Sequence, residues 1–176
     1  MYSGWRLAHP PHLGADARPH AHLTPEPGKS LFETIEQSGL PDDVTYVISR
    51  TELNFVLLNV YPYTVGHVMV LPRRALPSML DLPAEVYDDL WRLVRTATIA
   101  VNNAFRPDGL NIGVNEGTAG GGSQPDHLHV HVVPRWSADT NFMTTVADAR
   151  ILPITLADAW AQIRAAWPGD EGGELR

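Results

Sequence analysis

Apolar and polar residues follow one another along the chain in patterns that predict both strands and helices. Short β-branched and aromatic runs predict strands at residues 44–48, 54–60, 67–71, 110–115 and 127–135. Apolar residues at helical spacing predict a short helix over 31–37, the main helix over 83–105 and a short C-terminal helix over 156–167. This order of strands, long helix and further strands indicates an α+β domain with a largely antiparallel sheet.

Prolines and glycines interrupt the pattern near both ends of the chain. Residues 1–29 contain His9-Pro10-Pro11-His12 and Pro25-Glu26-Pro27-Gly28, which discourage helix and strand pairing, so we expect an irregular surface arm there. Residues 30–168 then form one domain, and 169–176 a short tail. The histidines of the arm are interpreted as surface groups rather than metal ligands: His9, His12, His20 and His22.

Composition narrows the classes of function. The chain of 176 residues is 44% hydrophobic, which is enough for one sizeable core. No apolar run approaches the roughly 20 residues of a membrane helix, the N-terminus lacks the order of a secretory signal, and cysteine is absent. We therefore expect a cytoplasmic protein with no membrane contact. The formal charge of −7 argues against nonspecific binding of nucleic acid, whereas a small anionic substrate is compatible with it.

Three histidines alternate with apolar residues over 127–132, so His127, His129 and His131 share one face of the predicted strand and the apolar residues share the other. The apolar face can join a core. The histidine face has three interpretations: structural groups, a metal site, or a catalytic row. A metal ion is disfavoured because the strand rise places the Cα atoms of residues 127 and 131 about 13 Å apart, and no carboxylate completes the set.

The catalytic interpretation is nucleophilic attack on phosphorus by a neutral imidazole, which forms a phosphoramidate. His129, in the middle, is the expected nucleophile, because its neighbours can orient it. Its other ring nitrogen should then donate to a fixed acceptor such as a backbone carbonyl. The glycine-rich loop 117–123 directly precedes the histidines, and such loops offer backbone N–H groups to anions.

Two blocks of the sequence resemble the diagnostic stretches of the histidine-triad (HIT) superfamily of nucleotidyl hydrolases and transferases. The first is 127–133, and the second is 58–70, in which a Gly-His pair opens a strand. The resemblance covers about residues 30–145. Within the superfamily, segments 109–115, 121–123 and 127–136, with Asp139 and Asn141-Phe142, are most similar to actinobacterial diadenosine tetraphosphate phosphorylases.

The resemblance implies a role for each matching residue. His129 matches the nucleophile, and His127 and His131 match the flanking histidines that orient it and serve the leaving group. Asn59 falls where the family binds ribose hydroxyls, and His67 at a supporting position near the phosphates. The remaining matches are phosphate-contacting positions and an aromatic position linked to activity or assembly: Asn115, Gly122 and Ser123 for phosphate, and Trp136 for the aromatic. Phe32 and Val60 fit either a base pocket or the core.

The sequence departs from the family pattern at one place. Many members carry two cysteines of a zinc site near the start of the domain, where this chain has Ser30-Leu31-Phe32-Glu33. Structural zinc at that site is therefore not expected. The chain keeps His131, which some branches replace by glutamine, so phosphorylase activity rests on the surrounding subgroup residues rather than on the triad.

The resemblance implies a two-step reaction on a dinucleoside polyphosphate. His129 takes an adenylyl group, and inorganic phosphate then removes it, so diadenosine tetraphosphate yields ADP and ATP. The alternatives are a hydrolase of dinucleoside polyphosphates or nucleoside phosphoramidates, a nucleotide-binding module without turnover, and a metal-binding protein. No cofactor is required, although a divalent cation can accompany the polyphosphate. A homodimer or higher homo-oligomer is expected from the family.

Overall fold

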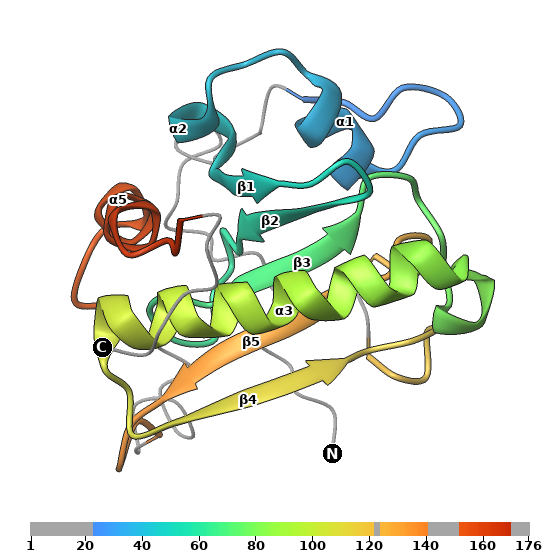
Figure 1. Cartoon of the computed structure of the whole chain (residues 1–176). Helices are drawn as coiled ribbons and strands as arrows, with labels where there is room; N and C mark the ends of the chain where they lie inside the picture. Colours follow the sequence, from blue (N-terminus) through green and yellow to red (C-terminus); the bar gives the residue numbers. More distant parts are fainter. Residues whose placement is uncertain (1–22, 122–123, 141–151, 170–176) are drawn as a thin grey trace.

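The computed structural model describes residues 23–121, 124–140 and 152–169. Within them, five strands form a sheet in the order β1-β2-β3-β5-β4, and every neighbouring pair is antiparallel (Figure 1). The strands are β1 (Val47–Arg50), β2 (Asn54–Leu58), β3 (Val68–Pro72), β4 (Gly109–Val114) and β5 (Val130–Arg135). The helices are α1 (Leu31–Gln37), α2 (Asp42–Thr45), the 3-10 turn η3 (Met79–Asp81), α3 (Ala84–Phe105) and α5 (Leu156–Ala165). The predicted α+β class is confirmed.

Helices cover both faces of the sheet. The long α3 and the C-terminal α5 pack on one face (Figure 1). On that face, Val56, Val70 and Val132 belong to the same buried cluster as the apolar residues of α3. On the other face, Phe32 and Ile35 of α1 pack over Phe55, Leu57, Met69 and Leu71. Strands β2 and β3 are therefore buried on both sides, which explains why they read as continuous apolar runs rather than as alternating ones.

The main helix is where the sequence pattern places it. Leu90, Val94, Ala97 and Val101 recur at helical spacing, and all four are buried against the sheet. The helix starts after Pro83 and ends at Arg106, whose left-handed backbone (φ 46°) is followed by Pro107. Proline cannot continue the backbone hydrogen bonds of a helix, so the chain turns directly into β4.

Two predicted strand starts are wrong. The strand expected over 44–48 begins only at Val47, because Asp42 to Thr45 form α2 and Tyr46 closes it with a left-handed backbone (φ 56°). The histidine strand begins at Val130 rather than at residue 127. The N–H of His127 donates to Gln124 in a turn, and that of Leu128 donates to the carbonyl of Leu76, so this stretch leaves the ladder.

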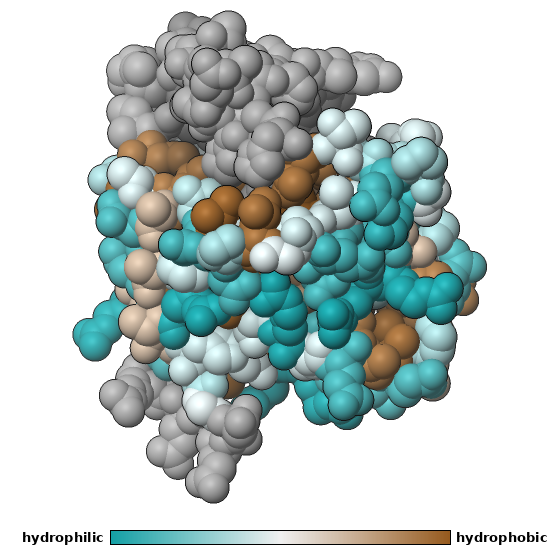
Figure 2. All heavy atoms as spheres, turned by 90° about the horizontal axis from the view of Figure 1, so that it is seen from above, coloured by the Kyte–Doolittle hydropathy of each residue, from teal (hydrophilic) through white to brown (hydrophobic). Residues whose placement is uncertain are grey.

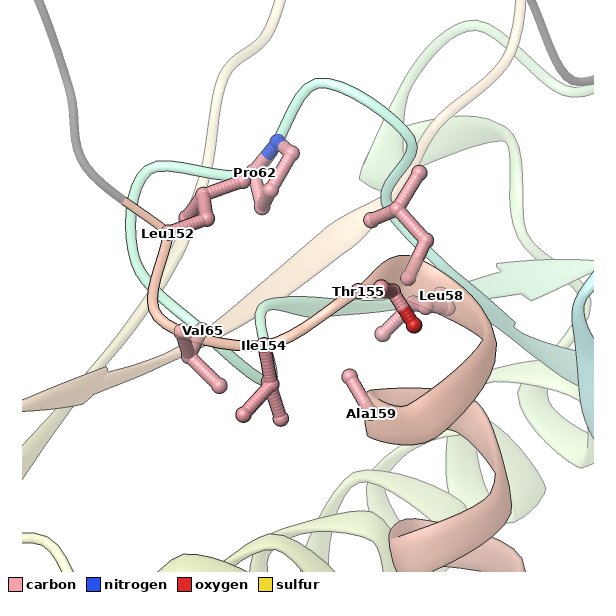
Figure 3. Close-up of a pocket in the computed structure, with 9 residues that line it drawn as sticks. Leu58, Pro62, Val65, Leu152, Ile154, Thr155 and Ala159 are labelled. Carbon is pink, nitrogen blue, oxygen red and sulfur yellow. The ribbon is translucent and has the colours of Figure 1, made fainter.

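The arm and the tail are described only in part. Of the predicted arm over 1–29, only residues 23–29 belong to the described chain, so His9, His12, His20 and His22 lie outside it. Of the predicted tail over 169–176, only Gly169 is described. Leu152 and Ile154, in the segment that leads into α5, line a small apolar pocket with the loop before β3. Pro62 lies beside Leu152 there, and Val65 lies beside Ile154 (Figure 3).

The surface of the described part carries both polar and apolar side chains. The face seen in Figure 2 mixes hydrophilic residues with smaller apolar areas. The large apolar side chains that stay exposed are Val44, Tyr61, Leu80, Tyr87, Ile112 and Leu152. None of the described helices is long and apolar enough to cross a membrane.

Truncation of the core beneath α3 should test this packing. Leu90 is fully buried, so Leu90→Ala is expected to lower the free energy of unfolding by about 2–5 kcal/mol through lost contacts and a residual cavity. Leu80 is 95% exposed, and Leu80→Ala is the matched control, with a change expected within about 0.5 kcal/mol. Urea unfolding followed by circular dichroism measures both. Equal losses in the two variants would contradict the described core.

Candidate active site

The histidines gather on the face of the sheet opposite α3. His131 stands on β5 between Met69 of β3 and Gly113 of β4, whereas Leu128, Val130 and Val132 join the core under α3. The predicted division into an apolar and a histidine face is therefore confirmed, although only His131 lies within the strand itself. Four histidines form one buried group with exposed fractions of 8% or less: His67, His127, His129 and His131.

Ring contacts show how closely these side chains are packed. The ring centroids of His129 and His131 are 4.7 Å apart, and those of His131 and His67 are 5.1 Å apart. The ring centroid of Phe32 in α1 lies 5.6 Å from the ring centroids of both His127 and His129. The predicted triad and His67 are thus brought together, and α1 forms one wall of the site.

His127 has both ring nitrogens engaged within the protein. Its Nε2 lies 2.8 Å from the backbone carbonyl oxygen of Pro72, which can only accept, so Nε2 carries a proton. Its Nδ1 lies 2.6 Å from Oγ of Ser30. In the neutral ring Nδ1 is therefore an acceptor, and the Ser30 hydroxyl donates to it. With both nitrogens occupied, His127 can orient its neighbours more readily than it can contact a leaving group.

His129 has one engaged nitrogen. Its Nδ1 donates to the backbone carbonyl oxygen of His127 at 2.8 Å. Since a carbonyl cannot donate, Nδ1 carries the proton and Nε2 of the neutral ring carries the lone pair. No residue in the described part of the chain hydrogen-bonds to this Nε2. The carbonyl acceptor that the sequence argument required is present.

The hydrogen bonds of His67 and His131 form a chain in which all donors point the same way. The backbone N–H of Tyr63 donates to Nδ1 of His67 at 3.1 Å, so this nitrogen is the acceptor of a neutral ring. The proton of His67 is then on Nε2, which donates to Nδ1 of His131 at 2.9 Å. Consequently the neutral His131 carries its proton on Nε2. Nδ2 of Asn115 lies 3.4 Å from this nitrogen, and the Asn115 amide accepts from it only when turned so that Oδ1 faces the ring.

A glycine makes the turn into His67 possible. Gly66 has a left-handed backbone (φ 76°), and a Cβ there would collide with the ring of Phe105. A side chain at this position would therefore have to displace either the Phe105 ring or the loop that leads into His67. The Gly-His pair noted in the sequence therefore has a steric reason.

Asn59 lies beside His67, with its Nδ2 3.3 Å from Nδ1 of that ring. Its Oδ1 accepts from the N–H of Tyr61 at 2.9 Å, the local turn that an asparagine before a proline loop commonly makes. The structure thus gives Asn59 a role in the turn and a place next to the histidines. The ribose contact stays a prediction.

The other predicted residues are placed less directly. Trp136 follows β5 in a loop held by a two-point pair of Arg135 with Asp139, whose carboxylate also accepts from the N–H of Trp136. The Arg135 guanidinium holds the pKa of Asp139 well below its usual range. No described contact joins Trp136 to the histidines, and its role stays a prediction. Gly122 and Ser123 lie outside the described residues.

Burial keeps the central histidines neutral. It lowers the pKa of both His127 and His129 below the ordinary value of 6.5, although their hydrogen bonds to backbone carbonyls act in the opposite direction. A neutral His129 is the form whose Nε2 can attack. Within the described residues, no group of three or more histidine, aspartate or glutamate side chains is arranged to hold a metal ion.

Comparison with known proteins places this geometry in a family. The family model described as "HIT domain" matches residues 41–138, more than half of the chain. The chain belongs to the HIT family. Its histidine group at residues 127–131 lies inside the matched region, as does His67.

Individual relatives and a solved structure resemble this HIT chain. It is 39% identical to a Mycobacterium tuberculosis protein named AP-4-A phosphorylase over 128 residues, 73% of this chain and 66% of that one. It is 36% identical to a bis(5'-adenosyl)-triphosphatase of Dictyostelium discoideum over 93 residues, 53% of this chain and 62% of that one. The chain therefore spans slightly less than two thirds of these curated relatives. A Hit-like protein from Bartonella henselae shares the fold, with a TM-score of 0.65, 22% identity and coverage of 81% and 98%.

Two residues of the HIT site were not among the predicted functional residues. Ser30 bonds to His127, and the ring of Tyr63 lies 4.6 Å from that of His67. The spacing Ser30-x-x-Glu33 before an apolar run is a capping-box pattern that was available in the sequence. Nothing in that pattern points to a histidine 97 residues further along the chain. No sequence pattern marked Tyr63 as a residue of the site.

The ring of His129 should titrate in an unusual range for histidine. Since burial lowers its pKa, we expect more than half of the rings to be neutral at pH 6.5 and the midpoint of protonation to lie at lower pH. NMR titration of the histidine Cε1 protons measures this directly, with a histidine in a short peptide as the reference. A His129 pKa at or above the reference value would contradict the buried, neutral ring.

Proposed function

We propose that this protein is a nucleotidyltransferase acting on dinucleoside polyphosphates, and that it works as a diadenosine tetraphosphate phosphorylase. The observation that carries the proposal is the hydrogen bond from Nδ1 of His129 to the carbonyl of His127, 2.8 Å long. It leaves the lone pair on Nε2, which is what nucleophilic attack requires. Two HIT relatives named for dinucleoside polyphosphate substrates support the same substrate class.

In the first step, Nε2 of His129 attacks the α-phosphorus of the polyphosphate. A nitrogen–phosphorus bond forms, the bond from that phosphorus to the bridging oxygen breaks, and ATP leaves from diadenosine tetraphosphate. We propose that Nε2 of His131 donates a proton or a hydrogen bond to the leaving group, because Nδ1 of His131 is already bonded to His67. The ring of His131 lies against that of His129, within reach of the same phosphate. His127, with both nitrogens engaged, orients His129.

In the second step, an oxygen of inorganic phosphate attacks the adenylyl phosphorus. ADP forms, and the nitrogen–phosphorus bond returns its electron pair to His129. The longer and closer similarity to the relative named a phosphorylase favours phosphate over water as the acceptor. Gly122 and Ser123 are proposed to hold the nonbridging oxygens, Asn115 to contact phosphate beside His131, and Asn59 to bind ribose.

A hydrolase is the second candidate, favoured by the relative named a triphosphatase. Water would then resolve the same intermediate, and AMP rather than ADP would be released.

A cytoplasmic location and the domain limits at 30 and 168 stay predictions. So does a homo-oligomer, which is supported by the edge position of β4 and by Ile112, 45% exposed on that strand.

Phosphate dependence separates the two candidates. A phosphorylase should convert diadenosine tetraphosphate to ADP and ATP only when phosphate is present, and should stop after one turnover in phosphate-free buffer. Chromatography of the nucleotides with and without phosphate measures this. Release of AMP and ATP at the same rate in both buffers would instead identify a hydrolase.

Replacement of the nucleophile tests the chemistry shared by both candidates. His129→Asn is expected to lower kcat by at least about 1,000-fold, because no other group replaces the lost lone pair. If the protein is a phosphorylase, the wild type quenched in phosphate-free buffer should also carry one adenylyl group by intact mass, whereas the variant should carry none under either mechanism. Thr96→Ala, on the exposed side of α3, is the control for mutation as such. Turnover in His129→Asn above a few per cent of wild type would refute the assignment.

A further inference from the structure

The side chain of Ser30 lies in the histidine group although it belongs to the start of α1. It is 3% exposed, and its Oγ is 2.6 Å from Nδ1 of His127. The same oxygen accepts the N–H of Glu33 at 3.1 Å and caps the helix. Oγ thus accepts from the helix and donates to the histidine. Neither step of the proposed reaction uses Ser30.

Ser30 is linked to His129 through His127 by hydrogen bonds. With Ser30 donating to Nδ1 and the carbonyl of Pro72 accepting from Nε2, the ring of His127 is held at both nitrogens. The backbone carbonyl of the same residue accepts from Nδ1 of His129. A displacement of His127 would therefore move the acceptor that decides which nitrogen of His129 carries the proton.

Glu33 connects Ser30 to a second segment of the chain by hydrogen bonds. Its carboxylate accepts the N–H of Ser30 and the N–H of Ala75, each at 2.9 Å. Burial raises the pKa of Glu33, but these two N–H groups, together with the nearby His127 and Lys29, leave the pKa below its ordinary value. Ala75 lies in the segment 72–76, whose carbonyls at Pro72 and Leu76 bind the His127 ring and the N–H of Leu128.

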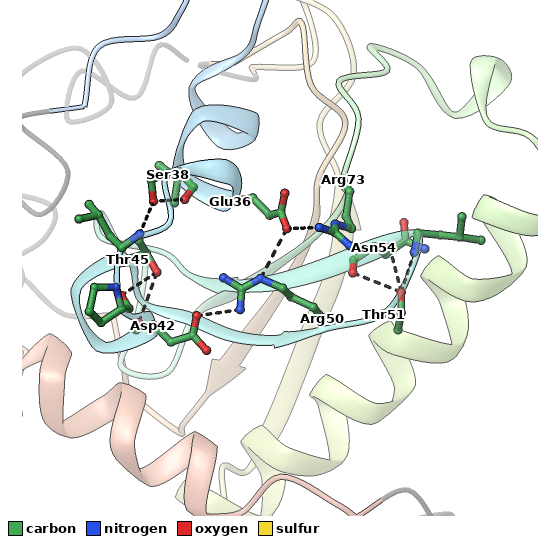
Figure 4. Close-up of polar contacts among 12 residues, drawn as sticks. Glu36, Ser38, Asp42, Thr45, Arg50, Thr51, Asn54 and Arg73 are labelled. Atoms are coloured by element: carbon green, nitrogen blue, oxygen red, sulfur yellow. Dashed lines mark hydrogen bonds and ion pairs between the residues drawn. The ribbon is translucent and has the colours of Figure 1, made fainter.

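An ion pair further along α1 connects the same two segments. The buried carboxylate of Glu36 pairs with Arg73 at 2.8 Å and with Arg50 of β1 at 3.5 Å (Figure 4). Arg73 directly follows Pro72, the acceptor for His127. Helix α1 therefore holds segment 72–76 at two points, while its first residues hold the histidine.

We propose that Ser30 is a positioning residue for His129: its hydroxyl fixes the ring of His127, and the carbonyl of His127 fixes the proton of His129 on Nδ1. The role in turnover rests on the proposed function. Glu33 keeps Ser30 in register with segment 72–76. The hydroxyl that caps α1 thus also holds His127.

Kinetics of three variants test the proposal. Ser30→Ala should lower kcat about 10- to 100-fold and leave KM within about twofold, because the nucleophile is misplaced while nucleotide contacts remain. Ser30→Thr keeps the hydroxyl and should recover most of the lost kcat. Thr155→Ala is the matched control, because Thr155 caps α5 in the same way without touching a histidine. A kcat of Ser30→Ala equal to that of Thr155→Ala would overturn the proposal.

Nitrogen-15 NMR of the histidine rings tests the coupling without substrate. In the wild type, His127 should be protonated on Nε2 and His129 on Nδ1. In Ser30→Ala, the Nδ1 resonance of His127 should shift and the Nδ1–H population of His129 should fall, with neither change in Thr155→Ala. Unchanged His129 spectra in Ser30→Ala would overturn the coupling whatever the activity. A wild type that turns over no dinucleoside polyphosphate would refute the proposed function alone.

Discussion

The hydrogen bond between Nδ1 of His129 and the carbonyl of His127 determines which ring nitrogen carries the lone pair. A backbone carbonyl can only accept, so the neutral ring has one tautomer available to it. Strand alternation is not needed for this bond, since His127 and His129 precede β5. The bond needs His127 to stay in place, and the Ser30 hydroxyl, the Pro72 carbonyl and the turn to Gln124 hold it there.

Burial makes the tautomers of the site interdependent. A charged imidazole is costly away from water, so His127 and His129 are neutral, and each neutral ring has one donor and one acceptor. The N–H of Tyr63 makes Nδ1 of His67 an acceptor, and His67 in turn makes Nδ1 of His131 an acceptor. Two chains of hydrogen bonds therefore reach the site. One runs from Ser30 through His127 to His129, and the other runs from Tyr63 through His67 to His131. One presents a lone pair on His129, and the other presents a proton on His131.

Helix α1 contributes to the site although its seven residues are few. Phe32 packs against two of the histidines, and Ser30 and Glu33 bond to His127 and to segment 72–76. A capped helix and backbone hydrogen bonds thus hold His127 in place.

The sequence by itself determined the long helix, the apolar β2 and β3, and the two-sidedness of residues 127–132, because these follow from periodicity and local burial. It also pointed to His129 and its neighbours through the family pattern. Only the tertiary structure decided that the histidine strand starts at Val130, that His67 meets His131, and that Ser30 meets His127. Those contacts join residues 64 and 97 positions apart. Their geometry depends on how the sheet pairs and where α1 docks, and no local pattern records either.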